Sequence, residues 1–191
     1  GLSSSADGTI VAFSTFAENL VPNDGNGFSD VYVRNTLTNE TELVSVAQDG
    51  GPGNNISYQP AISKGGRWVA FASLASNLVP DDTNGVVDVF LRDLQAGRTI
   101  RISTGPDGSQ ATTFSSFPSI ATNADETIVY ISFTSSATNL VAGGSNGLPH
   151  IFHCTYFSDM DAKITRQVSI GRTANGLAEG DEASVLSAIS A

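Results

Sequence analysis

The sequence predicts an all-β chain in which a four-stranded antiparallel sheet is repeated along one array, residues 1–191. Three observations lead to this fold class. A segment containing Asn-Leu-Val occurs three times, in residues 13–27, 71–85 and 133–147. Short runs between these segments alternate polar and apolar residues with the period of two that is typical of half-buried strands. No run shows helical periodicity. A repeat of roughly 60 residues indicates a stacked or radial architecture.

The second copy shows the elements of one unit most clearly. Residues 60–63 form a short first strand that begins with proline, where a missing N–H costs least. Residues 68–72 are β-branched and aromatic, which favours a second strand. Residues 73–87 form a long loop with an Asn-Gly turn. Residues 88–93 and 98–103 alternate polar and apolar side chains and are expected to be the third and fourth strands.

The other two copies follow the second strand for strand. In the first and third copies, the second strand is expected at 10–14 and 128–132, the third at 30–34 and 150–154, and the fourth at 42–46 and 165–170. A four-stranded antiparallel sheet repeated in tandem is typical of a β-propeller blade. The predicted blades span residues 2–46, 57–103 and 115–170, and each needs a neighbour to cover its face.

The two ends of the chain resemble each other. Residues 2–5 align with the first strand of the second copy, and so do residues 187–190. We therefore expect residues 184–191 to be an extra strand of a fourth or partner blade. Three blades leave open faces, so we expect either a fragment of a longer chain or copies that close a ring or extend a fibre. A six-bladed ring of two chains is the simplest closed arrangement, and the spare strand is suited to strand addition.

Composition narrows the classes of partner and compartment. Aspartate and glutamate outnumber lysine and arginine 19 to 9, and the formal charge is −10. This charge argues against nucleic acid and anionic membrane surfaces as partners, because both require a basic face. No apolar run approaches the roughly 20 residues of a membrane span. Cys154 is the single cysteine, so no intramolecular disulfide forms. Few lysines, many small polar residues and acidic loops favour a secreted, extracellular or periplasmic protein.

Two stretches of the first copy resemble a known repeat family. Residues 7–14 read Asp-Gly followed by a hydrophobic strand that ends in Phe-Ser, and residues 30–34 form a strand with an aromatic and a basic residue. This pattern resembles the WD40-like (PD40) repeat of TolB-like β-propellers. The second copy departs from it at Lys64, and the third at residues 123–126 and 150–154. The resemblance covers nearly the whole chain, and it implies a propeller fold and a protein-binding platform of the cell envelope or a propeller beside a peptidase. Fold alone does not carry function.

The long loop carries a motif that suits calcium. The pattern D-x-N-G-x-x-D occurs in the first and second copies. Its candidate metal ligands are Asp24, Asn26, Asp30, Asp82, Asn84 and Asp88. Carboxylate and amide oxygens at alternating positions around a glycine turn are ligands that calcium prefers. The third copy has Gly144 and His150 at the acidic positions, so two sites are expected rather than three.

A structural turn is the alternative interpretation of the same loop. Asn-Gly is a preferred turn dipeptide because both residues tolerate positive φ. On this interpretation the aspartates bond loop amides, the asparagines of the repeated segment tie the loop down, and Leu20, Leu78 and Leu140 plug the blades. Calcium is therefore a possible cofactor, and no other cofactor is expected.

The residue types needed for catalysis are sparse. His150 and His153 lie three apart in one predicted strand, so they point to opposite faces and do not share a metal. Cys154 reads as a small buried residue, and no nucleophile elbow is present. Arg34 and Arg92 recur beside Asp30 and Asp88, which predicts an inter-strand ion-pair network rather than an anion site.

These observations predict a non-enzymatic, extracellular or envelope scaffold and interaction module that self-associates through exposed blade edges. Its expected partner is another protein or a second copy, in an oligomer or a fibre, without nucleic acid and without membrane insertion. Two alternatives remain open. The chain is the propeller portion of a larger secreted hydrolase, or it is a calcium-dependent module that binds glycans.

Overall fold

The computed structural model describes residues 1–22, 24–173 and 176–179. In these residues it contains three four-stranded antiparallel sheets and no helix, which confirms the predicted all-β fold class of propeller blades. The strands of blade 1 are β1 Leu2–Ser4, β2 Ile10–Thr15, β3 Asp30–Asn35 and β4 Thr41–Leu43. Those of blade 2 are β5 Ser57–Ile62, β6 Trp68–Ser73, β7 Asp88–Asp93 and β8 Arg98–Arg101. Those of blade 3 are β9 Ser115–Thr122, β10 Ile128–Ser135, β11 His150–Phe157 and β12 Ala162–Gln167.

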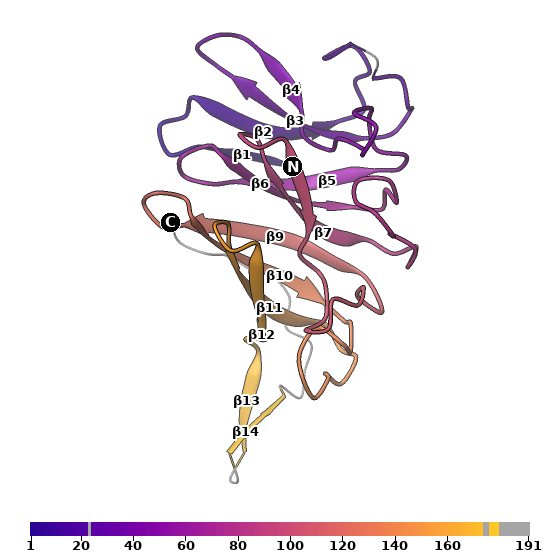
Figure 1. Cartoon of the computed structure of the whole chain (residues 1–191), viewed down its shortest axis with the longest axis vertical. Helices are drawn as coiled ribbons and strands as arrows, with labels where there is room; N and C mark the ends of the chain where they lie inside the picture. Colours follow the sequence, from indigo (N-terminus) through magenta and orange to yellow (C-terminus); the bar gives the residue numbers. More distant parts are fainter. Residues whose placement is uncertain (23, 174–175, 180–191) are drawn as a thin grey trace.

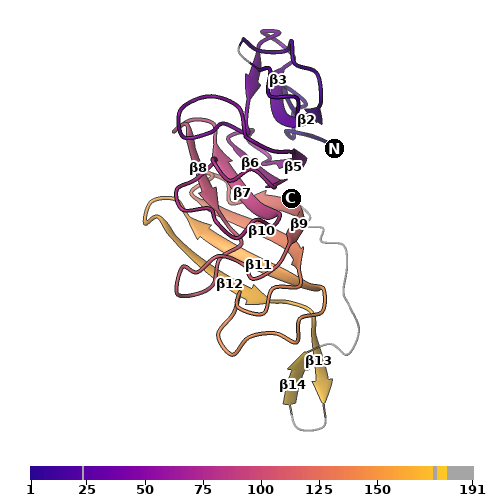
Figure 2. The same ribbon diagram turned by 90° about the vertical axis from the view of Figure 1, so that its right-hand side faces the viewer.

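The three blades follow one another along the array (Figure 1). Every sheet keeps its strands in chain order, from the first to the fourth. Figure 2 shows the sheets as successive layers, and contacts between neighbours are made where β2 meets β5 and where β6 meets β9. No helix in the described part of the chain is long and apolar enough to span a bilayer.

Proline in the first strand lies at a bulge, not at the start of the strand as the sequence predicted. Strand β5 begins at Ser57, and its register with β6 shifts between Tyr58 and Ala61. Gln59 adopts a positive φ of 54° at this shift, and Phe117 does the same in β9 with the same value. The bulge removes Pro60 from regular pairing, so the missing N–H breaks no ladder hydrogen bond.

The fourth strands end earlier than predicted. At the end of blades 1 and 2, a serine hydroxyl accepts the third-strand amide in place of a backbone carbonyl. After β4, the amides of Val44 and Ser45 both donate to the Val31 carbonyl, at 2.8 and 3.4 Å. After β8, Ile102 and Ser103 make the same pair of bonds to Val89. Two amides opposite one carbonyl interrupt the regular ladder. In blade 3 the strand spans 162–167 instead of 165–170.

A hairpin that the sequence did not predict follows blade 3. Strands β13 Ile170–Thr173 and β14 Gly176–Glu179 pair in antiparallel fashion and lie beyond β12 in Figure 1. The predicted extra strand, residues 184–191, lies outside the described residues.

The apolar core lies between blades. One cluster joins blades 1 and 2 and includes Val31 and Phe71, and a second joins blades 2 and 3 around Trp68 and Phe133. The indole N–H of Trp68 also donates to the carbonyl of Glu126 in blade 3 at 2.9 Å. Each blade thus buries apolar area by contact with its neighbour, which is the main favourable term in folding.

The leucine of the repeated segment fills these interfaces in two copies out of three. Leu78 and Leu140 are 3 % and 0 % exposed, whereas Leu20 is 37 % exposed. The expected plug is therefore present in blades 2 and 3, and Leu20 belongs to the face of blade 1 that no described blade covers.

Truncation of a plugging leucine tests this role. We expect Leu78→Ala to lower the free energy of unfolding by about 2–5 kcal/mol, because it removes buried methyl groups and leaves a cavity. Leu37, 76 % exposed in the turn between β3 and β4, is the matched control, and Leu37→Ala should change stability by less than about 0.5 kcal/mol. Urea unfolding measures both, and equal effects would contradict the assignment.

Candidate functional site

The Asn-Gly turn of each blade belongs to a buried polar network. In blade 2, Asn84 Nδ2 donates to Asp88 Oδ2 at 2.8 Å, and Ser103 Oγ donates to Asp88 Oδ1 at 2.5 Å. The amide of Val89 donates to Ser103 Oγ at 3.0 Å. Asp88 is only 1 % exposed. One buried carboxylate therefore joins the turn, the third strand and the end of the fourth strand.

Blade 1 repeats the network, and blade 3 replaces its acid. Asp30 accepts from Asn26 and from Ser45, both at 2.6 Å. In blade 3, His150 Nε2 lies 2.7 Å from Asn146 Oδ1, and its Nδ1 lies 2.9 Å from Ser169 Oγ. The Nε2–H tautomer fits both contacts, since it donates to the amide oxygen and accepts from the hydroxyl. The loss of acid in the third copy thus exchanges donor and acceptor in the asparagine contact, the serine still donates, and the network stays closed.

Burial dominates the ionisation of the two central acids. It raises the pKa of Asp88 above the ordinary value, although the hydrogen bonds from Ser103 and Asn84 oppose this shift. Burial likewise raises the pKa of Asp30 against the bonds from Ser45 and Asn26. Removing a carboxylate from water costs more free energy than these two bonds recover.

The outer acids of the motif have different partners in the two copies. Tyr32 donates its hydroxyl to Asp24 Oδ2, and burial, followed by repulsion from Asp30, raises the pKa of Asp24. Asp82 lies 3.3 Å from Arg101. Burial raises the pKa of Asp82 although the guanidinium lowers it. The motif therefore brings its two acids within electrostatic reach of each other in blades 1 and 2.

The asparagines of these loops also clasp the segments that link the blades. Asn84 Nδ2 donates to the carbonyl of Ala111, in the link from blade 2 to blade 3, at 3.2 Å. From the other side, Asn139 Oδ1 accepts the amide of Thr112 at 3.1 Å, and its Nδ2 donates to the Gln110 carbonyl at 2.8 Å.

The link from blade 1 to blade 2 is held in the same way. Asn26 Nδ2 donates to the carbonyl of Gly53 at 2.8 Å, and Asn77 accepts the amide of Asn54 at 2.9 Å. The two repeated asparagine positions therefore form hydrogen bonds with each link from both sides. The contacts of the predicted structural turn thus extend across the blade boundary.

For calcium, the arrangement supplies fewer free oxygens than the motif suggested. Asn26 and Asn84 direct Nδ2, a donor, at the central carboxylate, and their Oδ1 atoms accept turn amides. In the part of the chain that the structure describes, no three His, Cys, Asp or Glu side chains gather closely enough to hold a metal ion. Calcium binding by Asp24, Asn26, Asp30, Asp82, Asn84 and Asp88 stays a prediction.

The expected ion pairs of Arg34 and Arg92 with Asp30 and Asp88 are absent from the described residues. Residues four apart on a strand are separated by about 13 Å, too far for a direct contact. Arg34 instead donates to Thr41 at 2.8 Å, and Arg92 to Thr99 at 3.2 Å.

Blade 1 has an outer face whose counterparts in the other blades are buried. This outer face of blade 1 consists of Val11, Phe13, Ala17, Leu20 and Val21, all partly exposed. The counterparts in blade 2 are Val69, Phe71, Ala75, Leu78 and Val79, and all of them are buried against blade 1. Phe13 stacks on Tyr32 with ring centroids 5.8 Å apart, as Phe71 does on Phe90. The first blade thus has the surface of an inter-blade contact with no described blade upon it.

The serines of the network were not predicted from the sequence. Ser45, Ser103 and Ser169 each close the network from the end of a fourth strand. A signal was present, because each serine directly follows an apolar residue at the end of the copy. Serine is common in this chain, so the position alone did not distinguish these three.

Several solved structures are similar to this one. A TolB protein of Agrobacterium tumefaciens is 19% identical, with a TM-score of 0.49 over 88% of this chain and 46% of that one. The β-propeller domain of the Trilobed protease from Pyrococcus furiosus is 14% identical, with a TM-score of 0.48 over 88% and 42%. An acylaminoacyl peptidase of Pyrococcus horikoshii is 12% identical, with a TM-score of 0.43 over 87% and 24%.

The chain spans less than half the length of each of these three proteins. No protein-family model and no curated protein sequence matches it. The assignment to the propeller class rests on its own repeated, chain-ordered four-stranded sheets.

Substitution of Asn84, which bonds both Asp88 and the link to blade 3, distinguishes a structural role from calcium binding. Asn84→Ala removes bonds to Asp88 and Ala111, so we expect it to lower the free energy of unfolding by about 1–3 kcal/mol. If the role is structural, the loss is the same with millimolar calcium or with chelator in urea unfolding. A wild type that calcium stabilises, with a response lost in Asn84→Ala, would instead establish the metal site.

The raised pKa of Asp88 predicts a pH dependence of fixed sign. The folded state holds this proton more tightly than the unfolded state, so protonation favours folding. Relative to Asp88→Asn, the wild type should gain stability as the pH falls from 7 through the folded pKa towards about 4, the unfolded value. Urea unfolding across this range measures the difference. A difference that stays constant, or that shrinks on acidification, would contradict the effect of burial.

Proposed function

We propose that the chain is a non-catalytic scaffold and interaction module of the extracellular or periplasmic space, and that it associates with a second copy of itself. The observation that carries the proposal is the outer face of blade 1. Five apolar residues at this face stay accessible, although the same five positions in blade 2 are buried by the preceding blade. An exposed apolar patch of this kind is typical of an interaction site.

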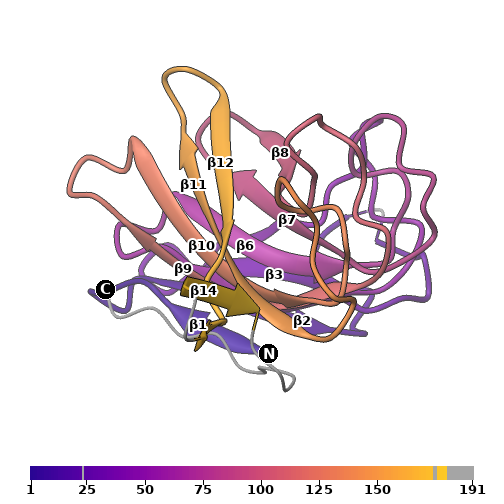
Figure 3. The ribbon, with the colours of Figure 1, turned by 90° about the horizontal axis from the view of Figure 1, so that it is seen from below.

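The repeat itself indicates what covers this face. In blade 2, Val69 and Phe71 pack against the opposite face of blade 1, through residues such as Val31 and Val44. The counterpart of Val44 in blade 3 is Val168, which is 56 % exposed. The far face of blade 3 therefore has an exposed apolar residue as well. Figure 3 is drawn from this end, where the hairpin β13–β14 also lies.

These two faces lie at the two ends of one array. In a pair of chains, the outer face of blade 1 of each copy can pack on the far face of blade 3 of the other copy. The two contacts together close a six-bladed ring. Closed propellers have four to eight blades, and closure covers the exposed apolar faces that favour aggregation.

Two described residues with catalytic chemistry, His150 and Cys154, serve the framework, which supports a role without catalysis. His150 is buried and contacts Asn146 and Ser169. Cys154 is buried, and burial raises the pKa of its thiol, which disfavours the nucleophilic thiolate.

Molar mass in solution tests the association. We expect light scattering to give the mass of two chains for the wild type at micromolar concentration. Leu20→Asp places a charge in the contact and should give the mass of one chain, since burying an unpaired charge is costly. Leu37→Asp introduces the same charge on an exposed turn and should remain a pair. A wild type with the mass of one chain would overturn the proposal.

A further inference from the structure

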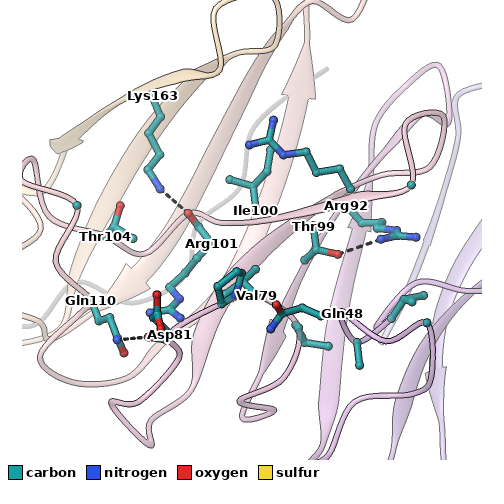
Figure 4. A pocket seen from close by; sticks show the side chains of 18 residues that line it. Gln48, Val79, Asp81, Arg92, Thr99, Ile100, Arg101, Thr104, Gln110 and Lys163 are labelled. Carbon is teal, nitrogen blue, oxygen red and sulfur yellow. Dashed lines mark hydrogen bonds between the residues drawn. The ribbon is translucent and has the colours of Figure 1, made fainter.

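A cleft beside β8 gathers much of the positive charge of this acidic chain. Its volume is about 1090 Å³, just above the range of about 300–1,000 Å³ that is typical of small-molecule sites. It lies between the link after blade 1, strand β8 of blade 2 and strand β12 of blade 3 (Figure 4). Four of the nine lysines and arginines line it, namely Arg92, Arg98, Arg101 and Lys163.

Two of these guanidinium groups are buried without full hydrogen bonding. Arg92 is 9 % exposed and Arg101 is 8 % exposed. Neither Nε atom has a hydrogen-bond partner among the described residues, and the buried hydroxyl of Thr104, in the same cleft, has none either. Three of the five buried side-chain polar atoms that lack a partner in the described chain thus line this cleft. Such atoms are costly to bury, and in native proteins they frequently mark a functional site.

Among the described residues, no carboxylate contacts the guanidinium of Arg92. Its only hydrogen bond in the described chain goes to the hydroxyl of Thr99 at 3.2 Å. Glu42 and Asp93 raise the pKa of Arg92 electrostatically, yet burial outweighs them and lowers it. Neither forms an ion pair with Arg92 among the described residues, and Asp93 is already paired with Arg67 at 2.6 Å.

The other cations of the cleft have partners of different strength. Arg101 lies 3.3 Å from Asp82, and Arg98 lies 2.6 Å from Asp161 at the exposed rim. Lys163 donates to the carbonyl of Arg101, a neutral acceptor (Figure 4). Arg92 and Lys163 therefore leave the cleft with positive charge that its own acids do not neutralise by contact.

We propose that this cleft binds a small ligand through an oxyanion, a carboxylate or a phosphate group. A guanidinium presents paired donors that match such a group, and a charge-assisted bond of this kind is stronger than a neutral one. The ligand supplies the missing acceptor for Arg92 and counter-charge for Lys163. The volume leaves room for an organic portion of the ligand larger than the oxyanion itself.

The repeat provides a matched control for the test. Arg34 is the counterpart of Arg92 in blade 1, bonds Thr41 in the way that Arg92 bonds Thr99, and does not line the cleft. Isothermal titration with inorganic phosphate and, separately, with citrate distinguishes a phosphate from a carboxylate preference. Low ionic strength is required because salt screens the attraction.

We expect the wild type to bind at least one of these probes with a dissociation constant below about 10 mM. Arg92→Gln should weaken binding by about tenfold or more, the loss of one charge-assisted bond, whereas Arg34→Gln should bind as the wild type does. Arg98→Gln alters the exposed rim without disturbing a buried group, so it provides a second variant if Arg92→Gln does not fold. It should weaken binding several-fold.

Three results would overturn the proposal. The first is a wild type that binds neither probe up to about 10 mM. The second is equal weakening in Arg34→Gln and Arg92→Gln, which would indicate a general charge effect. The third is unchanged affinity in Arg92→Gln and Arg98→Gln, which would place the anion elsewhere.

Discussion

Asparagine side chains from the blades on both sides form hydrogen bonds with the link between two blades, and the order of the array depends on this interaction. Asn84 reaches the link from the blade before it, and Asn139 from the blade after it. Because Asn84 also bonds the buried Asp88, the grip is anchored in the third strand of its own sheet. A sheet has two faces, and only a fixed neighbour lets it bury an apolar one. The amides fix the neighbour, and apolar burial such as that of Phe71 supplies the stability.

The same logic explains why the repeated segment changes between copies without losing its role. The third copy has His150 in place of aspartate, and the contacts to Asn146 and Ser169 are retained. Donor and acceptor are exchanged only in the contact with asparagine, because the serine hydroxyl donates in all three copies. A buried network must be satisfied throughout, because a half-satisfied one costs more than an apolar core. By contrast, the leucine of the first copy, Leu20, is left partly exposed since no described blade covers it.

Local patterns allowed much of the fold to be predicted, and contacts between distant residues account for what was missed. Strand β7, Asp88–Asp93, was predicted with its observed bounds, because alternation is a property of neighbouring residues. The bulge at Pro60 depends on pairing with β6, which the local pattern does not contain. Arg92 and Lys163 are far apart in sequence, and only the fold brings both to the lining of one cleft. The acidic motif was recognised from the sequence. The direction in which its asparagine side chains point depends on their contacts with the link between blades, which the local pattern does not contain.

Amide hydrogen exchange at the links tests the central claim most directly. Thr112 bonds the side chain of Asn139, and Ser115, at the start of blade 3, bonds the Val87 carbonyl of blade 2 at 2.7 Å. If the asparagine hydrogen bonds hold the blades together, both amides exchange as slowly as those of the core strand β6. Asn139→Ala should then accelerate exchange at Thr112 and Ser115 while β6 stays protected. Rapid exchange of Thr112 and Ser115 in the wild type, beside a protected β6, would show that the blades are held without the asparagines and would contradict the account.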